Sequence, residues 1–313
     1  MEPRYDFKRK WVTMSSLDIP RQGAPSFKLV SYNILAQDLL LEHINLYLKI
    51  KQEWLTWRRR FENLQREITK LDPDIICLQE MQYDHLPLLV QGLQSRSNGK
   101  RLEYVYKKKT GHRTDGCAII YDSFKFNLVE QRCVELYDDR VTLLNRENVA
   151  LLTKFRLKDN QKQTEEEPIE FIVATTHLLY NPKRQDVRCA QVTKLLEELQ
   201  TFTGLTKPII LTGDFNSEID SSPIEVLLST QHSQKSFNFE VLDTGESTAS
   251  TLQHEWITVD YILRSNCAQS KHQLQVDSIY TLPSISNCCE IGPIPNHYLG
   301  SDHYSLGAVF RVV

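Results

Sequence analysis

The sequence predicts an α/β fold built from mixed β-sheets. Apolar segments of strand length alternate with segments of helical periodicity, such as residues 54–71. Several strands follow one another without a helix between them, at 102–106, 117–122, 149–156 and 169–176. A purely parallel, doubly wound sheet is therefore not expected. No internal repeat and no linker divides the 313 residues, so one domain is predicted.

The domain is predicted to begin near residue 26. Residues 1–25 show little periodicity and include three prolines and a glycine, which indicates a lead-in segment. The stretch FKLVSYNIL (27–35) then predicts a strand that ends on polar side chains. We therefore assign 1–25 to a lead-in segment and 26–313 to a single domain.

A helix and a second strand are expected next. Residues 54–71 place Trp54, Phe61, Leu64 and other apolar side chains on one stripe with charges opposite, and Asp72-Pro73 ends the helix. DIICLQE (74–80) is a short apolar run that ends on a carboxylate, which predicts a buried strand.

The second half repeats this alternation. A long helix is predicted over 183–202, and further strands are predicted within KPIILTGDFNS (207–217), ITVDYIL (257–263) and YSLGAVFRVV (304–313). Two polar stretches interrupt the pattern: 158–168, expected to be a hairpin connection, and 229–256, which is long for a loop and so is either functional or disordered.

The composition excludes several classes of protein. With 41% hydrophobic and 25% charged residues, the chain has the make-up of a globular protein, and no apolar run reaches the roughly 20 residues of a membrane helix. The seven cysteines are scattered and lack CxxC spacing, which argues against a disulfide framework or a zinc site. Reduced thiols and the absence of a visible signal peptide predict a cytoplasmic or nuclear location.

Charge is modest and local. The net charge is −3, so the chain lacks the general basic character of a nucleic-acid coat. Arg58–Arg60 is expected to lie on a solvated face. A second basic run, Lys107–Lys109 with His112 and Arg113, falls in an apparent loop and is either a phosphate-binding rim or another solvated surface.

Polar residues recur at the ends of apolar strands. If these strands share sheets, their ends can converge on one cleft. Asn, Asp and Glu supply the hard oxygen ligands that Mg²⁺ prefers, and the metal completes its shell with water and phosphate oxygens. The pattern therefore indicates Mg²⁺-assisted phosphoester chemistry. The residues are Asn33, Glu80, His177, Asp214, Asn216, Asp260, Asp302 and His303.

Each member also has an ordinary structural explanation. Alone, LTGDFNSEID (211–220) is a polar turn after a strand, because Asp and Asn side chains bond to nearby backbone. Glu80 alone would be a surface acid, since most glutamates are exposed, and His177 a partly buried histidine with an internal partner. The set indicates a shared cleft, whereas no single member does.

The same residues resemble a known family. SYNIL, ICLQE, THL, LTGDFNS, TVDYIL and SDHYSL, in this order, are similar to the endonuclease/exonuclease/phosphatase superfamily over about residues 27–313. DGCAIIY, NVALLTKF and THLLYNPKRQDVRCAQ further resemble the nocturnin and deadenylase-like branch, and within it the Angel group. The resemblance implies an α/β fold with a two-sheet mixed β-sandwich flanked by helices, in four α-β-β-α layers, with the site at one end of the sheets.

The resemblance also implies residue roles. Asn33, Glu80 and Asp302 are expected to surround Mg²⁺. Asp214, Asn216 and His303 are expected to handle the attacking water, the phosphoryl oxygens or a second metal; His177 would donate to the phosphate and Asp260 would orient His303. Substrate contacts are expected at Asn148, Asn181, Pro182 and Trp256.

The substrate expected from the resemblance is an RNA 3′ end, with no membrane partner. Relatives in the deadenylase-like branch clamp a base with an aromatic residue before DYI, but Glu255 stands there in this chain, with Trp256 beside it as either a stacking or a core residue. Resemblance to the Angel group instead favours a 2′,3′-cyclic phosphatase that leaves a diol. The alternatives are a 3′-5′ exoribonuclease or poly(A) deadenylase, and a non-catalytic RNA-processing adaptor.

Overall fold

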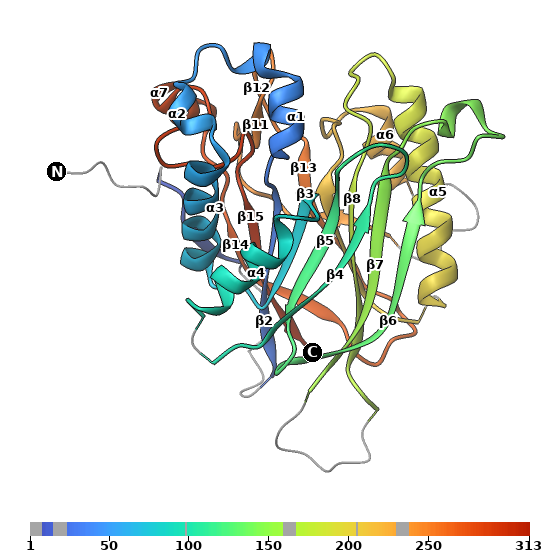
Figure 1. Cartoon of the computed structure of the whole chain (residues 1–313). Helices are drawn as coiled ribbons and strands as arrows, with labels where there is room; N and C mark the ends of the chain where they lie inside the picture. Colours follow the sequence, from blue (N-terminus) through green and yellow to red (C-terminus); the bar gives the residue numbers. More distant parts are fainter. Residues whose placement is uncertain (1–7, 15–23, 98, 159–166, 205, 230–237) are drawn as a thin grey trace.

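The computed structural model forms four layers, in which two β-sheets face each other and helices cover both outer faces (Figure 1). It describes residues 8–14, 24–97, 99–158, 167–204, 206–229 and 238–313. Residues 159–166 of the predicted connection at 158–168, and residues 230–237 of the predicted loop at 229–256, lie outside these ranges. The four-layer architecture inferred from the family resemblance is confirmed.

The first sheet has seven strands in the order β1-β14-β15-β2-β3-β5-β4. Only β2 and β3 run parallel; the other neighbours are antiparallel. The strands are β1 (Trp11–Thr13), β2 (Ser26–Asn33), β3 (Ile75–Gln82), β4 (Leu102–Lys108), β5 (Asp115–Asp122), β14 (Leu274–Tyr280) and β15 (Leu306–Val312).

The second sheet has six strands in the order β10-β13-β9-β8-β7-β6, and here too one pair, β8 and β9, is parallel. A separate two-stranded ribbon joins β11 to β12. The strands are β6 (Phe126–Glu135), β7 (Val149–Leu157), β8 (Glu170–His177), β9 (Ile209–Asp214), β10 (Glu240–Val241), β11 (Thr251–Leu252), β12 (Trp256–Ile257) and β13 (Asp260–Ser265).

Three apolar clusters fill the three spaces between the layers. The cluster between the sheets includes a group of phenylalanines from both, among which Phe27 stacks on Phe171 at 4.7 Å between ring centres. A second cluster joins the first sheet to α3 and α4, and a third joins the second sheet to α5 and α6. Burial of these apolar surfaces, at about 25 cal/mol per Å², holds the layers together.

The two predicted helices are present, the first of them with one interruption, and further helices were not predicted. Thr56 is extended (ψ 138°), so the helix predicted over 54–71 is split into α2 and α3. The helical elements are α1 (Gln37–Glu42), η1 (Ile44–Tyr47), α2 (Gln52–Leu55), α3 (Trp57–Leu71), α4 (Leu86–Gln94), η2 (Thr142–Leu144), α5 (Gln185–Thr203), α6 (Ser222–Leu228) and α7 (Ile285–Ile291). Within the described ranges, every helix is too short or too polar to cross a bilayer.

The structure changes two expectations about the N-terminal half. Trp11–Thr13, assigned to a lead-in segment, pairs with Tyr280–Ser278 and forms the edge strand β1. In the basic run, Arg58 is exposed but Arg60 is fully buried, because its guanidinium donates to Gly300 O (2.8 Å), to Gln37 Oε1 (2.8 Å) and to the carbonyls of Ile34 and Leu35. Such a group of acceptors replaces the water lost on burial.

One buried amide ties the two sheets together next to their shared end. Gln79 Nε2, on β3, donates to Thr175 Oγ1 on β8 at 2.8 Å and to Ser31 Oγ on β2 at 3.2 Å. All three side chains are buried. The bond from Gln79 to Thr175 crosses the sandwich and fixes the spacing of the sheets beside the site.

Candidate active site

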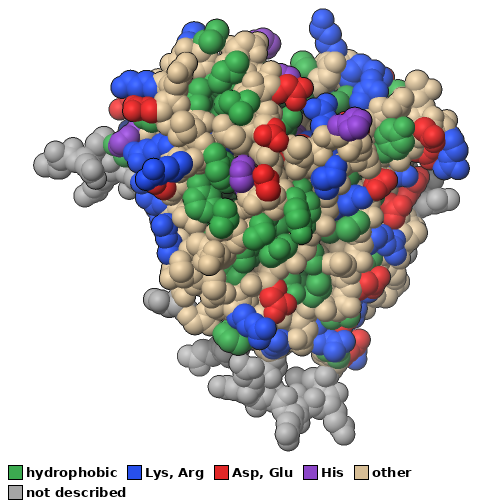
Figure 2. All heavy atoms as spheres, viewed as in Figure 1, with side chains coloured by type: hydrophobic (Ala, Val, Ile, Leu, Met, Phe, Trp, Pro, Cys, Tyr) green, Lys and Arg blue, Asp and Glu red, His purple; other side chains and the backbone are tan. Residues whose placement is uncertain are grey.

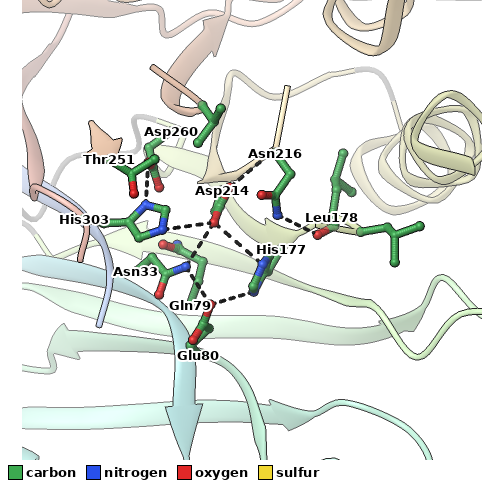
Figure 3. A network of polar contacts seen from close by, with 12 residues as sticks. Asn33, Gln79, Glu80, His177, Leu178, Asp214, Asn216, Thr251, Asp260 and His303 are labelled. Carbon is green, nitrogen blue, oxygen red and sulfur yellow. Dashed lines mark hydrogen bonds and ion pairs between the residues drawn. The ribbon is translucent and has the colours of Figure 1, made fainter. Parts of the chain in front are cut away.

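Polar side chains from both sheets meet at one end of the sandwich, where they point toward one another (Figure 3). The two parallel strand pairs explain why. The ends of β2 and β3 bring Asn33 beside Gln79, and the ends of β8 and β9 bring His177 beside Asp214. Parallel neighbours end at the same edge of a sheet, so each sheet delivers two chemical groups to one place.

Glu80 reaches this place through a β-bulge. The pairing between β3 and β5 shifts between Leu78 and Met81, and Glu80 has a left-handed backbone (φ 55°). A bulge adds one residue to a strand and redirects its side chain. The sequence predicted that this strand ends at Glu80, but β3 continues to Gln82. The bulge within the strand is what directs the Glu80 carboxylate into the site.

The turn after β9 is tightly built. Gly213 has φ 151°, and a Cβ there would lie 2.1 Å from the Thr176 carbonyl oxygen, so a side chain is excluded. Asp214 Oδ1 accepts from the Asn216 backbone N–H at 2.9 Å, and Asn216 (φ 48°) donates its amide Nδ2 to Leu178 O at 3.0 Å. This turn fixes the Asp214 side chain through Oδ1 and leaves Oδ2 facing Asn33, His177 and His303.

Asp260 and His303 arrive from strand beginnings. The sequence reading placed them at strand ends, but Asp260 is the first residue of β13 and His303 precedes β15. Because β13 is antiparallel to β9, Asp260 lies directly opposite Asp214. β15 is likewise antiparallel to β2, which brings Asp302 and His303 to the edge where Asn33 lies.

Asn33 joins two acids. Its Nδ2 donates to Glu80 Oε1 and to Asp214 Oδ2, both at 3.0 Å, and its Oδ1 accepts from Leu35 N at 3.0 Å. It was predicted to be a direct oxygen ligand of a metal. In the structure it presents its amino group to the carboxylates, so it holds Glu80 and Asp214 at a fixed spacing across the two sheets.

His177 lies between these acids and a buried lysine. Its Nε2 is 3.6 Å from Asp214 Oδ2, and its Nδ1 is 3.9 Å from Glu80 Oε1 and 3.4 Å from Lys109 Nζ. Burial, the Lys109 ammonium and His303 hold the pKa of His177 well below its usual value. His177 is therefore a neutral imidazole at physiological pH.

Lys109 is a site residue that the sequence placed only within a basic run. Its ammonium is 2.7 Å from the buried carboxylate of Asp115. Burial acts to lower the pKa of Lys109, but the Asp115 and Glu80 carboxylates outweigh it and raise that pKa, so the charge is retained. The other members of the run face outward: Lys107 pairs with Glu135, and Arg113 with Glu147.

His303 and Asp260 form a buried pair. His303 Nδ1 is 2.8 Å from Asp260 Oδ2, and its Nε2 is 3.7 Å from Asp214 Oδ2. Burial acts to lower the pKa of His303, but the Asp260 and Asp214 carboxylates raise it well above its usual value. One imidazole of the site is therefore cationic, whereas the other, His177, is neutral.

The acids are crowded in a way that suits a cation. Burial and the Asp260 carboxylate raise the pKa of Asp214 to about 7, and burial and the Asp302 carboxylate raise the pKa of Glu80. Two groups of possible ligand atoms share Asp214: Glu80, His177 and Asp214, and Asp214, Asp260 and His303, each within 4.8 Å of one another. These oxygens fit a hard divalent metal ion. Asp302, whose carboxylate raises the pKa of Glu80, stands outside both groups.

Asp302 has its own support. Its Oδ2 accepts from the Tyr47 hydroxyl at 2.7 Å, and Ser301 Oγ lies 3.5 Å from its Oδ1. Ser301 Oγ also donates to Asn33 O at 2.6 Å, which ties the loop before β15 to the end of β2. Tyr47 could not be found from the sequence, because no pattern connects residues 255 positions apart.

The four predicted substrate-contacting residues lie in different settings. Asn148 is buried, and both ends of its amide are engaged: Nδ2 donates to His177 O at 2.9 Å, and Oδ1 accepts from Gln191 at 2.8 Å. It thus supports the His177 backbone. Asn181 and Pro182 are exposed in the loop after β8, four and five residues beyond His177. Trp256 is half-buried and packs against the core between the sheets.

The fold and the site together define a phosphoric ester hydrolase. Buried carboxylates that can hold a cation and two imidazoles of opposite charge state meet the needs of phosphoryl chemistry, which are charge neutralisation and an oriented water. A helix-flanked double sheet presents them at one end.

Comparison with known proteins agrees with this class. The model of the Endonuclease/Exonuclease/phosphatase family matches residues 30–303. Protein angel of Drosophila melanogaster is 59% identical over 321 residues, covering 100% of this chain and 89% of the fly protein. The chain spans 29% of the length of the mammalian Protein angel homolog 1 relatives.

Solved structures show the same relationship. The crystal structure of ANGEL2, a 2′,3′-cyclic phosphatase, in complex with adenosine-2′,3′-vanadate is similar with a TM-score of 0.80 at 28% identity, over 97% of this chain and 99% of that one. The human Nocturnin catalytic domain with bound sulfate has a TM-score of 0.71 at 26% identity, over 99% and 100%. The chain belongs to the Endonuclease/Exonuclease/phosphatase family and, within its nocturnin-like branch, to the Angel group. Enzymes of this family depend on divalent metal ions.

Proposed function

We propose that this chain is a Mg²⁺-dependent phosphatase that removes 2′,3′-cyclic phosphate from RNA 3′ ends and leaves a 2′,3′-diol. The observation that carries the proposal is the position of His303, whose Nε2 is 3.7 Å from Asp214 Oδ2 and whose Nδ1 is 2.8 Å from Asp260 Oδ2. Similarity to ANGEL2 supports the choice of substrate. The reaction takes two hydrolytic steps: one water opens the ring by breaking a P–O bond, and a second releases inorganic phosphate.

Asp214 and His303 divide the proton transfers. Asp214, which bound metal would keep ionised, would accept a proton from the attacking water. His303, held cationic by Asp260, would donate a proton to the departing ribose oxygen. Both groups are buried, so bulk water does not compete for the protons.

The remaining residues hold the phosphoryl group. His177, being neutral, would donate an N–H to a phosphoryl oxygen, and Asn216 would orient the water beside Asp214. Glu80, Asp214 and Asp302 would hold Mg²⁺, which when bound supplies positive charge that stabilises the phosphoryl oxygens. Asn33, which donates to Glu80 and Asp214, would hold these two carboxylates at a fixed distance from each other.

The surface favours contact with a short terminal segment of RNA. In Figure 2, Lys and Arg side chains are scattered over the visible face together with acidic ones, and they form no continuous band there. Binding a long track of phosphates depends on many cations. Asn181, Pro182 and Trp256 are proposed to contact the terminal nucleotides, and the location is proposed to be cytoplasmic or nuclear, where such RNA ends occur.

The test compares two labelled RNAs that share the same body sequence and differ at the 3′ end, in the presence of Mg²⁺. One ends in 2′,3′-cyclic phosphate and the other in an adenosine tail with free hydroxyls. The proposal expects the first to become a diol with release of inorganic phosphate, and the second to remain intact. Shortening of the tail with the cyclic end untouched would identify an exoribonuclease or deadenylase instead. No turnover of either RNA would favour a non-catalytic adaptor.

A further inference from the structure

We infer that Tyr47 is a positioning residue that fixes the Asp302 carboxylate and thereby sets the affinity of the site for Mg²⁺. The inference rests on the proposed function, in which Asp302 helps to hold the metal. Tyr47 acts through Asp302, by a hydrogen bond of 2.7 Å between its hydroxyl and Oδ2.

The hydroxyl is a permanent donor. Tyrosine ordinarily has a pKa of about 10, so the hydroxyl keeps its proton at physiological pH. A hydrogen bond to an ionised carboxylate is shorter and roughly twice as strong as one between neutral groups. It occupies one lone pair of Oδ2 and leaves the remaining lone pairs of the carboxylate for a metal ion.

The tyrosine ring is held independently of the main core. Tyr47 is 8% exposed and packs with Leu35, Leu40 and Leu55 in a small separate cluster. This cluster anchors the segment from α1 to α2, which leaves the first sheet directly after the Asn33 turn. The cluster thus fixes the Tyr47 hydroxyl relative to Asn33. The hydrogen bond then fixes the position of the Asp302 carboxylate relative to both residues.

Orientation matters more for Mg²⁺ than for Ca²⁺. Mg²⁺ demands near-ideal octahedral geometry, whereas Ca²⁺ accepts 6–8 oxygens in flexible arrangements. Groups that orient metal ligands typically contribute about 10–100-fold to metal affinity. Releasing the Asp302 carboxylate should therefore weaken Mg²⁺ binding and affect Ca²⁺ binding less.

The experiment titrates Mg²⁺, and separately Ca²⁺, into metal-stripped full chain and follows the melting temperature without RNA. A ligand that binds the folded chain stabilises it in proportion to ln(1 + [L]/Kd), so the titration reports affinity without turnover. Tyr47→Phe should raise the apparent Kd for Mg²⁺ by about tenfold or more and that for Ca²⁺ by a smaller factor.

Tyr121→Phe is the matched control, because Tyr121 is also buried and its hydroxyl also donates to a carboxylate, Glu103 Oε2 at 3.1 Å, away from the site. It should leave both affinities unchanged. Repeating Tyr47→Phe in an Asp302→Asn background should change the Mg²⁺ affinity by less than about twofold, since interacting residues are non-additive.

Three outcomes would overturn the inference. The first is an unchanged Mg²⁺ affinity in Tyr47→Phe. The second is an equal loss of Mg²⁺ and Ca²⁺ affinity, which would show a general structural effect. The third is a full effect of Tyr47→Phe in the Asp302→Asn background. If the unaltered chain shows no response to Mg²⁺, the metal assignment of the proposed function fails and the inference fails with it; a failure confined to Tyr47→Phe leaves that function intact.

Discussion

His303 Nδ1 and Asp260 Oδ2 are 2.8 Å apart in a pocket where both side chains are buried. Asp260 stabilises the cationic form of His303. Asp260→Asn should therefore lower the pKa of His303 and reduce kcat/KM by about 10²–10⁴-fold, as in other His–Asp pairs. Because activity needs protonated His303, it falls as pH rises through the His303 pKa, and this limb of the pH–rate profile should move to lower pH. Asp243→Asn, at an exposed acid, should leave the profile unchanged.

Glu80 should separate metal binding from folding. Glu80→Gln keeps the shape of the side chain and removes a charge that burial and Asp302 disfavour. We expect the metal-free protein to be as stable as the unaltered chain or slightly more stable, while stabilisation by Mg²⁺ and cleavage of cyclic-phosphate RNA are lost. Melting curves with EDTA and with Mg²⁺ check this. Stabilisation of Glu80→Gln by Mg²⁺ equal to that of the unaltered chain would remove Glu80 from the metal site.

The benefit of Mg²⁺ should depend on pH. The folded pKa of Asp214 is raised to about 7 from a usual value near 3.8. A raised acid pKa means that, without metal, stability is lost as pH rises from about 4 through about 7, because the folded state must release a proton that it holds tightly. Bound Mg²⁺ favours the ionised form and offsets this loss. The increase in melting temperature on adding Mg²⁺ should be larger at pH 7.5 than at pH 5.5, and Asp214→Asn should flatten the difference.

Lys109 should control the charge of His177. Lys109→Met removes an ammonium 3.4 Å from His177 Nδ1, so the pKa of His177 should rise and the acidic limb of the pH–rate profile should move to higher pH. The change also leaves buried Asp115 without a partner, which costs about 3–5 kcal/mol. The double variant with Asp115→Asn should recover stability but retain the shifted profile; an unshifted profile would show that Lys109 does not act on His177.

Arg60 and Arg58 offer a matched comparison of neighbouring arginines on one helix. The Arg60 guanidinium is fully buried among acceptors from Gly300, Gln37 and the turn after β2, whereas 93% of the Arg58 side chain is exposed. Arg60→Met should destabilise the chain by about 3–5 kcal/mol, because buried acceptors lose their donors. Arg58→Met should change stability by less than about 0.5 kcal/mol. Urea unfolding of the two variants measures the difference.

Much of the fold was readable from the sequence because apolar strands and helix stripes follow simple periods. The strand at 75–82 and the helix at 185–203 agree with prediction to within a few residues. By contrast, β6 and β14 were missed. β6 is exposed along most of its length, as a partly covered edge strand can be, and β14 alternates buried and half-buried residues.

The sequence predicted most residues of the candidate site but not how the fold brings them together. Glu80 and His177 do lie close to Asp214. However, a β-bulge and not a strand end directs Glu80 into the site. Asp260 reaches the site at the start of a strand that pairs antiparallel with β9. Asn33 presents its amino group to both acids. Tyr47 and Lys109 were not assigned site roles, because contacts between distant segments leave no local pattern.

The bond between Gln79 and Thr175 has a mechanical consequence. Glu80 belongs to one sheet and Asp214 to the other, so the distance between them depends on the thickness of the sandwich. The bond from Gln79 to Thr175 and large core side chains such as Phe27 and Phe171 set that thickness together. Substitutions that change the size of these core side chains would therefore change the distance between Glu80 and Asp214. The packing of the interior thus sets the spacing of the catalytic groups. Substitutions in the core would change turnover without altering any residue that contacts the substrate.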